Sequence, residues 1–577
     1  MRGLLTSSIG VTCAAALALP LTPPATAATA RPAPSAEVAP VVAPDLSGST
    51  QSLPLTPLTR DRALGAAEQG VPRRDVSPFS LLGVVWDNPD AELLGTVQVR
   101  TRAAGTGTWS GWQDVETHYA DHGADPDTAE RASGHVRGAT APLWVGDSDG
   151  VEVRVRPDAA RRTEETGRGI RTRTTPVPLP GGMRLELIDP GKDPESATVA
   201  RGDRPAVARE ETAASRTPAD ESYGGSYSES DGGSVGESYG RSDGESYGRS
   251  DGESYGRSDG ESYGGSDGES YGGSDGESYG RSDGESSGGS YGESYGGTYG
   301  GSYGEQAVRA AIAPSAMHAS GASAFASRAA SAASAANAPL APLGALEIPA
   351  LDRAQTRSEL LALRGSELTK AQRAKPYIGP RPRIVTRRGW SADEGLREAG
   401  FRYTSKVKAA FVHHSATGNS YKCSQAPSVI RGIYRYHVRS LGWRDIGYNF
   451  VVDKCGTIYE GRAGGVAKAV LGAHTLGFNT NSMGIAVLGT FTSTKPSSAT
   501  VKAVAGLTAW KLGLFGGNPK GKTYLKSAGG NLYPKGKNVR LNVISGHRDG
   551  FATECPGKQL YGKLGSARKT AAKYQGR

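Results

Sequence analysis

An octapeptide repeat in the middle of the chain limits what the sequence can fold into more than any other feature. Residues 221–305 repeat the unit Gly-Glu-Ser-Tyr-Gly-(Arg or Gly)-Ser-Asp, and its tyrosine recurs every eight residues at Tyr239, Tyr247, Tyr255, Tyr263, Tyr271 and Tyr279. Because the unit has no aliphatic side chain to bury, it cannot offset the conformational entropy that is lost on ordering. A flexible solvated tether is the favoured interpretation. A repetitive β-roll is the alternative.

Composition indicates that still more of the chain is linker. The 577 residues include 81 glycines and 34 prolines, and only 37% are hydrophobic, so the whole length cannot form a packed globule. We expect a low-complexity linker over residues 191–350, in which an Ala/Ser/Pro-rich stretch, transiently helical in part, follows the repeats. After the N-terminus the chain has no uncharged apolar run of about 20 residues, which excludes a polytopic membrane protein and predicts no integral membrane segment in the mature chain.

The N-terminus has the pattern of an export signal. Arg2 provides the positive start, the apolar stretch spans residues 4–21, and Ala25-Thr26-Ala27 is typical of a cleavage site. We therefore expect a signal peptide over residues 1–27 and a secreted protein. Lipid attachment at Cys13 is the alternative, and it is disfavoured because apolar residues continue beyond the cysteine.

After a linker over residues 28–77, we predict a small β-rich domain over residues 78–190. Short alternating runs separated by Gly, Pro and Asp turns predict its strands, at residues 82–86, 97–100 and 151–155. Four tryptophans fall in this range: Trp86, Trp109, Trp112 and Trp144. Either they fill a sandwich core, which is the favoured interpretation, or they form a sugar-stacking face on a wall-binding module. The sequence leaves the role of this domain open.

Charge is distributed unevenly along the chain. Residues 221–305 contain 18 acidic and 4 basic residues, a net charge of −14, whereas residues 381–577 contain 32 basic and 8 acidic residues, a net charge of +24. A basic surface suits a polyanion such as nucleic acid, anionic lipid or the anionic polymers of a bacterial wall. Because export disfavours nucleic acid, we expect wall polymers as partners and no nucleic acid.

The C-terminal part of the chain, residues 351–577, is predicted to be an α/β domain with a mixed central sheet flanked by helices. Its predicted strands are apolar runs at residues 409–412, 448–452, 484–488 and 542–545. Its predicted helices are stretches with helical spacing at residues 428–441 and 501–512. Strands that alternate with helices are typical of this fold class.

This domain also concentrates side chains that bind metals. It contains five of the nine histidines (His413, His414, His437, His474 and His547), and Cys555 lies eight residues after His547. Two histidines at strand ends and a thiolate are suitable zinc ligands, and a catalytic site would leave one position open for water. The spacing between His547 and Cys555 is not that of a zinc finger, and a histidine at a strand end is often a packed polar residue. Spacing alone leaves both interpretations open.

A series of motifs in one order shows a resemblance to a known family. The motifs are Arg383-Ile384-Val385-Thr386-Arg387 with Trp390, Phe411-Val412-His413-His414-Ser415-Ala416, Gly442-Trp443-Arg444-Asp445-Ile446-Gly447-Tyr448-Asn449-Phe450, Gly456-Thr457-Ile458-Tyr459-Glu460-Gly461-Arg462, Gly472-Ala473-His474, Gly477-Phe478-Asn479, Ser482-Met483-Gly484-Ile485, Gly546-His547-Arg548 and Thr553-Glu554-Cys555-Pro556-Gly557. Residues 383–563 therefore resemble the peptidoglycan recognition proteins and the related phage-type N-acetylmuramoyl-L-alanine amidases. The resemblance covers about a third of the chain and does not reach residues 28–380.

The resemblance implies a Zn²⁺ site with two catalytic helpers. The metal ligands would be His413, His547 and Cys555. Tyr448 matches the family tyrosine that faces the attacking water. Thr553 departs from the family pattern, because some phage relatives have lysine there. A threonine hydroxyl can donate a hydrogen bond but has no charge, so we expect an uncharged second helper.

The resemblance also implies contacts with the substrate. His437, His474 and Asn479 resemble positions that line the muramyl-peptide groove, and polar packing beside the sheet is the alternative for each. His414 follows a metal ligand on a strand, where successive side chains point to opposite faces. We therefore expect His414 to have a structural role.

Cysteine arithmetic predicts one disulfide. If Cys13 is removed with the signal peptide, the mature chain has three cysteines, and an exported protein tends to pair them. With Cys555 assigned to the metal, Cys423 and Cys455 are expected to form a disulfide that closes a loop of about thirty residues.

Together these features predict a secreted zinc hydrolase that cleaves the amide bond between N-acetylmuramic acid and L-alanine in bacterial peptidoglycan. Many family members that only recognise peptidoglycan lack the cysteine, so Cys555 favours hydrolysis. The alternative is a non-catalytic protein that binds peptidoglycan through the same groove. The expected partners are muramyl peptides and anionic wall polymers.

Overall fold

The computed structural model describes residues 48–58, 68–117, 119, 121–166, 169–192 and 317–577. The expected signal peptide, the octapeptide repeats and most of the expected linker lie outside these residues. The described chain comprises a β-rich N-terminal domain and a mixed α/β C-terminal domain, which confirms the predicted fold class. No helix in this described part is both long enough and apolar enough to cross a membrane.

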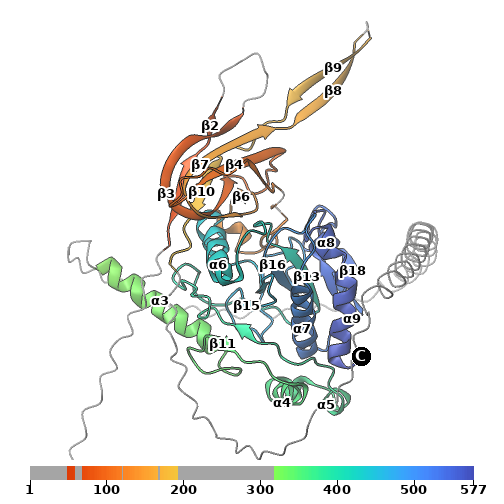
Figure 1. Ribbon diagram of the computed structural model, residues 1–577. Helices are drawn as coiled ribbons and strands as arrows, with labels where there is room; N and C mark the ends of the chain where they lie inside the picture. The colour runs from red at the N-terminus through yellow and green to blue at the C-terminus, as the bar shows by residue number, and fades with distance from the viewer. Residues whose placement is uncertain (1–47, 59–67, 118, 120, 167–168, 193–316) are drawn as a thin grey trace, which may run out of the picture. The chain divides into compact units, whose positions relative to one another are not determined.

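The N-terminal domain is built on an antiparallel sheet. In spatial order its strands are β1 (Thr50–Pro54), β10 (Arg184–Ile188), β3 (Gln69–Trp86), β7 (Leu143–Pro157), β4 (Gly95–Ala103) and β5 (Gln113–Val115), while β2 (Thr56–Pro57) and β6 (Gly138–Ala139) pair with β3. Val97, Val99 and Val153 are buried in one core, because alternate side chains of a strand share a face. A separate hairpin is formed by β8 (Ala159–Thr166) and β9 (Gly169–Pro176) (Figure 1).

This domain begins earlier in the chain than predicted. Strand β1 and the first residues of β3 lie within residues 28–77, a range expected to be a linker. Strand β1 has no strong alternation of its own. It forms because it pairs with β10 along its whole length, with Thr50 opposite Ile188, and a tertiary partner of this kind is not visible in a local pattern.

The four tryptophans of the domain have two different environments. Trp86 and Trp144 are buried, as expected for core residues. Trp109 and Trp112 are half-buried, and the guanidinium carbons of Arg73 and Arg154 lie 4.1 Å and 4.0 Å from their respective ring centroids. Core packing therefore accounts for only two of the four.

The C-terminal domain has a seven-stranded mixed sheet. Its strand order is β11 (Glu347–Ile348), β12 (Ile384–Val385), β15 (Ile458–Glu460), β14 (Phe450–Val452), β16 (Ser482–Val487), β13 (Ala409–His414) and β19 (Ile544–Gly546). Strand β13 is parallel to both neighbours, β16 and β19, and all of its residues are buried. A hairpin of β17 (Lys522–Lys526) and β18 (Asn538–Asn542) packs against Phe411 of β13.

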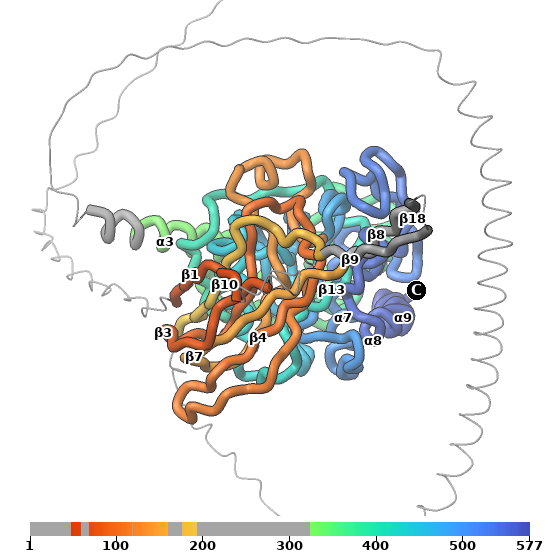
Figure 2. Tube along the Cα trace, turned by 90° about the horizontal axis from the view of Figure 1, so that it is seen from above, coloured from red at the N-terminus to blue at the C-terminus, as the bar shows by residue number. Residues whose placement is uncertain are grey.

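Helices cover both faces of this sheet. On one face α7 (Ser498–Leu514) and α9 (Leu564–Gln575) lie side by side (Figures 1 and 2), and Trp510 of α7 packs in a core with Val412 and Ile485. On the other face α6 (Ala426–Arg435) packs through Ile433 against Ala486. Further helices are α4 (Arg353–Arg364), α5 (Lys370–Ala374) and α8 (Lys558–Tyr561).

An additional helix, α3 (Met317–Ala336), lies in the range expected to be linker. The expectation of a low-complexity linker with only transient helix up to residue 350 is therefore wrong for this part. Alanine has the highest helix propensity, and Ala329 and Ala333 are buried. Asn337, directly after the helix, donates two hydrogen bonds of 2.9 Å to the Glu460 carboxylate on β15, which attaches the helix to the domain.

The two domains belong to one compact unit and share a hydrophobic core. Leu81 and Val85 of β3 are buried in the same cluster as Ile433 and Tyr436 of the C-terminal domain. The Tyr436 hydroxyl donates a hydrogen bond of 3.0 Å to the Thr140 carbonyl. The approach is so close at Gly83 that a Cβ there would lie 2.4 Å from the Tyr436 oxygen.

Candidate metal centre

The sheet of the C-terminal domain brings two of the predicted metal ligands together. His413 lies near the end of β13, and His547 begins a short 3₁₀ turn (His547–Asp549) directly after β19. Because β13 and β19 are parallel neighbours, with Val412 opposite Gly546, their carboxyl ends lie at the same edge of the sheet. The two imidazole rings have centroids 4.4 Å apart.

The third predicted ligand, Cys555, is held by the turn that follows His547. The Arg548 amide donates to the Cys555 carbonyl at 3.0 Å, and the Cys555 amide donates to the Thr553 hydroxyl at 3.2 Å. The Cys555 sulfur lies 3.8 Å from Nδ1 of His413. The structure thus brings together all three residues that the sequence predicts as ligands.

A fourth residue, His122, completes this group. One ligand atom from each of His122, His413, His547 and Cys555 lies within 4.8 Å of all the others, and all four residues are buried. His122 belongs to the N-terminal domain, in the loop between β5 and β6. This group differs from the expected site, in which one position would be open for water, because His122 from the other domain lies beside the three expected ligands.

The hydrogen bonding of these four residues fits a zinc ion. Zinc bonds of about 2.0–2.1 Å to nitrogen and about 2.3 Å to sulfur place neighbouring ligands of a tetrahedron roughly 3.3–3.6 Å apart. Here the Cys555 sulfur lies 3.8 Å from Nδ1 of His413, and all four candidate ligand atoms lie within 4.8 Å of one another. Nδ1 of His122 lies 2.7 Å from a carboxylate oxygen of Asp121, while its Nε2 and both ring nitrogens of His547 are buried without a hydrogen-bond partner among the described residues. A histidine that binds a metal through one ring nitrogen typically donates a hydrogen bond from its other ring nitrogen to a carboxylate.

Burial dominates the electrostatics of this group. It lowers the pKa of His413 well below the ordinary value, and the neighbouring His547 adds to this effect. It also lowers the pKa of His547 to about 3 and raises the pKa of Cys555 well above that of a free thiol. Burial alone would raise the pKa of Asp121, but His122, His547 and a hydrogen bond from Thr553 lower it below its usual range. Asp121 is therefore the charged group beside the ligands.

The two predicted catalytic helpers lie next to the ligands. Tyr448 is buried, and its ring centroid lies 5.6 Å from that of His413. Burial raises the pKa of its hydroxyl, which therefore keeps its proton at neutral pH. That hydroxyl lies 3.2 Å from the hydroxyl of Tyr119, a residue of the same loop as His122. Thr553 lies two residues before Cys555, and its hydroxyl oxygen accepts a hydrogen bond from the Cys555 amide.

The three residues predicted to bind substrate are all buried. Nε2 of His437, which lies in a π-helical turn (Tyr436–Ser440), is 2.6 Å from the Tyr119 hydroxyl. Asn479 donates hydrogen bonds of 2.8 Å to the Gly123 carbonyl and to the Asp125 carboxylate. His474 instead packs beside the sheet, with Nδ1 3.0 Å from the Thr475 hydroxyl. The N-terminal domain thus occupies the polar atoms of two of the three.

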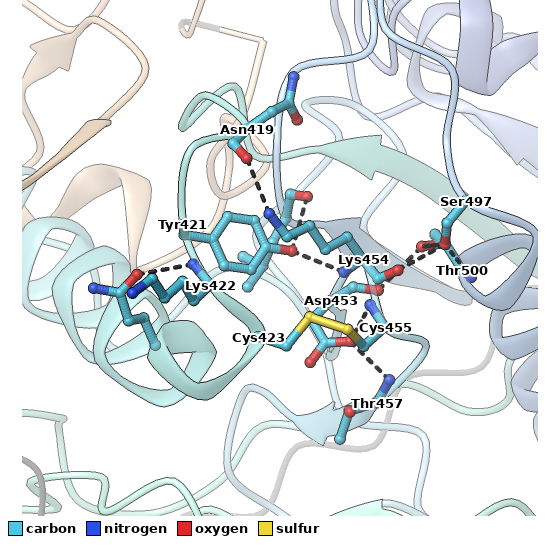
Figure 3. Close-up of a disulfide and its surroundings, with 12 residues drawn as sticks. Asn419, Tyr421, Lys422, Cys423, Asp453, Lys454, Cys455, Thr457, Ser497 and Thr500 are labelled. Carbon is cyan, nitrogen blue, oxygen red and sulfur yellow. Dashed lines mark hydrogen bonds between the residues drawn. A yellow bond between two sulfur atoms is a disulfide. The ribbon is translucent and has the colours of Figure 1, made fainter.

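The predicted disulfide between Cys423 and Cys455 is present (Figure 3). It joins the short turn before α6 to the turn between β14 and β15. Asp453 orders the second turn by accepting hydrogen bonds from the amides of Cys455 and Thr457, at 2.9 Å and 2.8 Å. The pairing leaves Cys555 as the only free cysteine among the described residues.

Sequence reasoning did not find the residues that the N-terminal domain contributes to the site. Besides His122, these are Tyr119, Asp121 and Asp125. A signal was available, because three of the four histidines outside residues 351–577 lie at positions 118, 122 and 135. No spacing rule connects that cluster with ligands on the far side of the long linker.

Comparisons with known proteins find similarity in both domains. Residues 403–558 match the N-acetylmuramoyl-L-alanine amidase family, and residues 34–176 match the Rv3811 N-terminal galactose-binding domain-like family. Peptidoglycan-recognition protein SC2 is 30% identical in Drosophila simulans and 32% identical in Drosophila melanogaster, in each case over 183 residues, 31% of this chain and 84% of the relative. A solved structure of peptidoglycan recognition protein-LE in complex with tracheal cytotoxin is 29% identical, with a TM-score of 0.25, and covers 32% of this chain and 92% of that one. On the strength of the two SC2 relatives, the chain belongs to the peptidoglycan-recognition protein family.

Proposed function

We propose that this protein is a secreted, zinc-dependent N-acetylmuramoyl-L-alanine amidase that cleaves the bond between the lactoyl group of muramic acid and L-alanine. The observation that carries the proposal is the grouping of His413, His547 and Cys555 in one buried cluster of the amidase domain. Zinc held there would make water a nucleophile near neutral pH and would polarise the scissile carbonyl.

Tyr448 is the proposed hydrogen-bond donor of the reaction. Its protonated hydroxyl is a hydrogen-bond donor in a buried site, where a donor directed at developing negative charge is worth about 10²–10³ in rate. Thr553 would support the site less directly, because its hydroxyl oxygen accepts the Cys555 amide and so orders the loop that presents the sulfur. His437 and Asn479 would bind the muramyl peptide through the polar atoms that now contact the N-terminal domain.

The expected location and partners follow from the sequence. The export pattern at residues 1–27 supports secretion, and peptidoglycan lies outside the cytoplasmic membrane. The net charge of +24 over residues 381–577 would attract the domain to the anionic polymers of the wall.

A second candidate function follows from the fourth ligand. Four protein ligands around zinc are typical of a structural site, whereas a catalytic site keeps one position for water. With His122 in place, the chain could be a recognition protein whose metal only stabilises the groove. The presence of Tyr448 beside the ligands favours the amidase, because a purely structural zinc site does not need it.

Product analysis discriminates between these functions. The full chain and its His122→Ala variant would be loaded with zinc and incubated with a defined muramyl pentapeptide, with and without a chelator. An amidase releases a peptide with a free L-alanine amino terminus together with the intact sugar, and the chelator stops this release. If neither protein releases peptide although each contains one zinc per chain, the amidase proposal is wrong and the recognition function stands.

A further inference from the structure

The loop between β5 and β6, residues 116–137, enters the candidate active site from the N-terminal domain. Apart from a single 3₁₀ turn (Arg131–Ser133), its described residues have no regular secondary structure. His122 lies within it and contributes the fourth atom of the ligand group. The His122 ring is 4.6 Å from that of His547 and 5.2 Å from that of His413, measured between centroids.

The same loop contacts residues next to the ligands that are predicted to bind substrate or to act in catalysis. The Tyr119 hydroxyl contacts both His437, at 2.6 Å, and Tyr448, at 3.2 Å, so one side chain engages a predicted substrate contact and the predicted catalytic donor. The Asp125 carboxylate accepts the Gly477 amide and the Asn479 side chain, both at 2.8 Å. These are the types of contact that the hydroxyl, amide and carboxylate groups of a muramyl peptide would make.

A buried ion pair fixes the far part of the loop. Glu130 forms a bidentate pair with Arg462, at 2.8 Å and 3.0 Å, and both side chains are less than a tenth exposed. Glu130 also accepts the Arg444 amide at 3.2 Å. The loop is therefore attached to the amidase domain by specific polar contacts, and the shared hydrophobic core below it keeps its two ends in place.

We propose that the β5–β6 loop is an autoinhibitory insert, in which His122 is the fourth zinc ligand and Tyr119 and Asp125 take the place of substrate. In this state neither the attacking water nor a muramyl peptide has access, and the amidase is latent. This inference rests on the proposed function. Activity would require the loop to withdraw, which would take Nε2 of His122 away from the ligand group and free His437, Tyr448 and Asn479 for water and substrate.

The composition of the contact makes this withdrawal feasible. The Tyr119 hydroxyl, the Asp125 carboxylate and His122 engage the site through polar atoms, whose partners water and substrate can replace. The Tyr119 ring is also buried in the shared hydrophobic core, stacked with its centroid 6.3 Å from that of Trp443. Gly123 has a φ of 127°, in a region that favours glycine, and a Cβ there would lie 3.6 Å from the nearest atom of Trp443, so the loop presents no side chain to Trp443 at this position.

The test uses the full zinc-loaded chain and three single variants. His122→Ala removes the proposed fourth ligand. Asp125→Ala leaves all ligands in place and removes the carboxylate that holds Asn479. His135→Ala is the matched control, because His135 is an exposed histidine of the same loop. For each protein one measures the zinc dissociation constant, the visible spectrum of the Co²⁺-substituted form, the affinity for a muramyl pentapeptide and the rate of its hydrolysis.

We expect His122→Ala to bind zinc about 10–100-fold more weakly, to change the Co²⁺ spectrum, and to bind and hydrolyse the peptide at least about tenfold better than the unaltered chain. An apparent affinity falls in proportion to the fraction of molecules in the competent state, so freeing a masked groove raises it. Asp125→Ala should keep its zinc affinity and its Co²⁺ spectrum and show a smaller gain in peptide binding. His135→Ala should match the unaltered chain throughout.

The outcomes separate this inference from the function on which it rests. If the unaltered chain binds and hydrolyses peptide as well as His122→Ala does, the amidase stands and autoinhibition is wrong. If His122→Ala gains peptide binding without hydrolysis, the loop masks the groove and the amidase proposal is wrong. If both His122→Ala and Asp125→Ala gain neither binding nor hydrolysis, masking is overturned, and His122 is only a structural ligand.

Discussion

The four candidate metal ligands come from two regions that are built in different ways. His413 and His547 follow parallel neighbouring strands, and Cys555 is fixed by backbone hydrogen bonds of the next turn. His122, in contrast, lies in a long loop and is oriented by the adjacent carboxylate of Asp121. The C-terminal domain therefore supplies three of the candidate ligands, from its sheet and the turn that follows, whereas the fourth comes from the loop for which we propose withdrawal. In that proposal the three ligands stay together whether or not the loop is in place, and only access to them changes.

The largest effect is expected at Cys555, one of the three candidate ligands that the C-terminal domain supplies. Cys555→Ser should weaken zinc binding by more than about 100-fold, because loss of even an outer-sphere partner costs 10–100-fold. It should also abolish peptide hydrolysis in the His122→Ala background. Zinc content after dialysis measures the first effect. The matched control is Cys423→Ser with Cys455→Ser, which should lower stability by about 2–4 kcal/mol and keep the metal. Full zinc occupancy in Cys555→Ser would contradict the ligand assignment.

The next largest effect is a loss of hydrolysis rate without loss of the metal, and we expect it at Tyr448. Tyr448→Phe, measured in the His122→Ala background, should fold and retain zinc but lose about 10²–10³ in hydrolysis rate, because it removes one buried donor. Tyr403→Phe serves as the control, since Tyr403 is an exposed tyrosine that donates to the Gly464 carbonyl away from the ligands. Turnover unchanged by Tyr448→Phe would remove this hydroxyl from the mechanism.

A smaller effect is expected at the β5–β6 loop, which supplies the fourth candidate ligand. Glu130→Gln breaks the buried ion pair with Arg462, and removing one partner of such a pair costs up to about 3–5 kcal/mol. We expect faster hydrogen exchange of the β5–β6 loop and more peptide hydrolysis, with the zinc content unchanged.

Burial alone would raise the pKa of Glu130, but Arg462 lowers it below the ordinary value. The contribution of this ion pair to the stability of the folded state is therefore fully present above the ordinary glutamate pKa. It is lost as the pH falls through the lowered pKa of Glu130. Unchanged exchange in the loop would show that this pair does not hold it.

The smallest effect is expected at the exposed ion pair of the same loop. Asp127 lies 2.6 Å from Lys535, and both side chains are more than half exposed. Solvent-exposed pairs contribute less than about 1 kcal/mol, so Asp127→Asn should change neither loop exchange nor hydrolysis measurably. An effect as large as that of Glu130→Gln would mean that net charge, rather than the buried contact, retains the loop.

Local patterns and distant contacts were not equally predictable from the sequence. His413, His547 and Cys555 could be predicted because they match motifs of the family that the sequence resembles, and Cys423 and Cys455 because an exported chain pairs its cysteines. Strand β1 was missed, and helix α3 was expected only as transient helix within a linker, because the stability of both comes from partners far along the chain. His122 was missed for the same reason, because only the packing of one domain on the other brings it to the ligands.

X-ray absorption at the zinc edge of the full-length protein decides whether His122 binds the metal, because it counts the histidine rings and sulfur atoms bound to zinc. We expect three histidines and one sulfur in the unaltered chain, and two histidines, one sulfur and an oxygen in His122→Ala. A spectrum of the unaltered chain with two histidines and a water oxygen, or a purified chain that binds no zinc, would contradict this expectation.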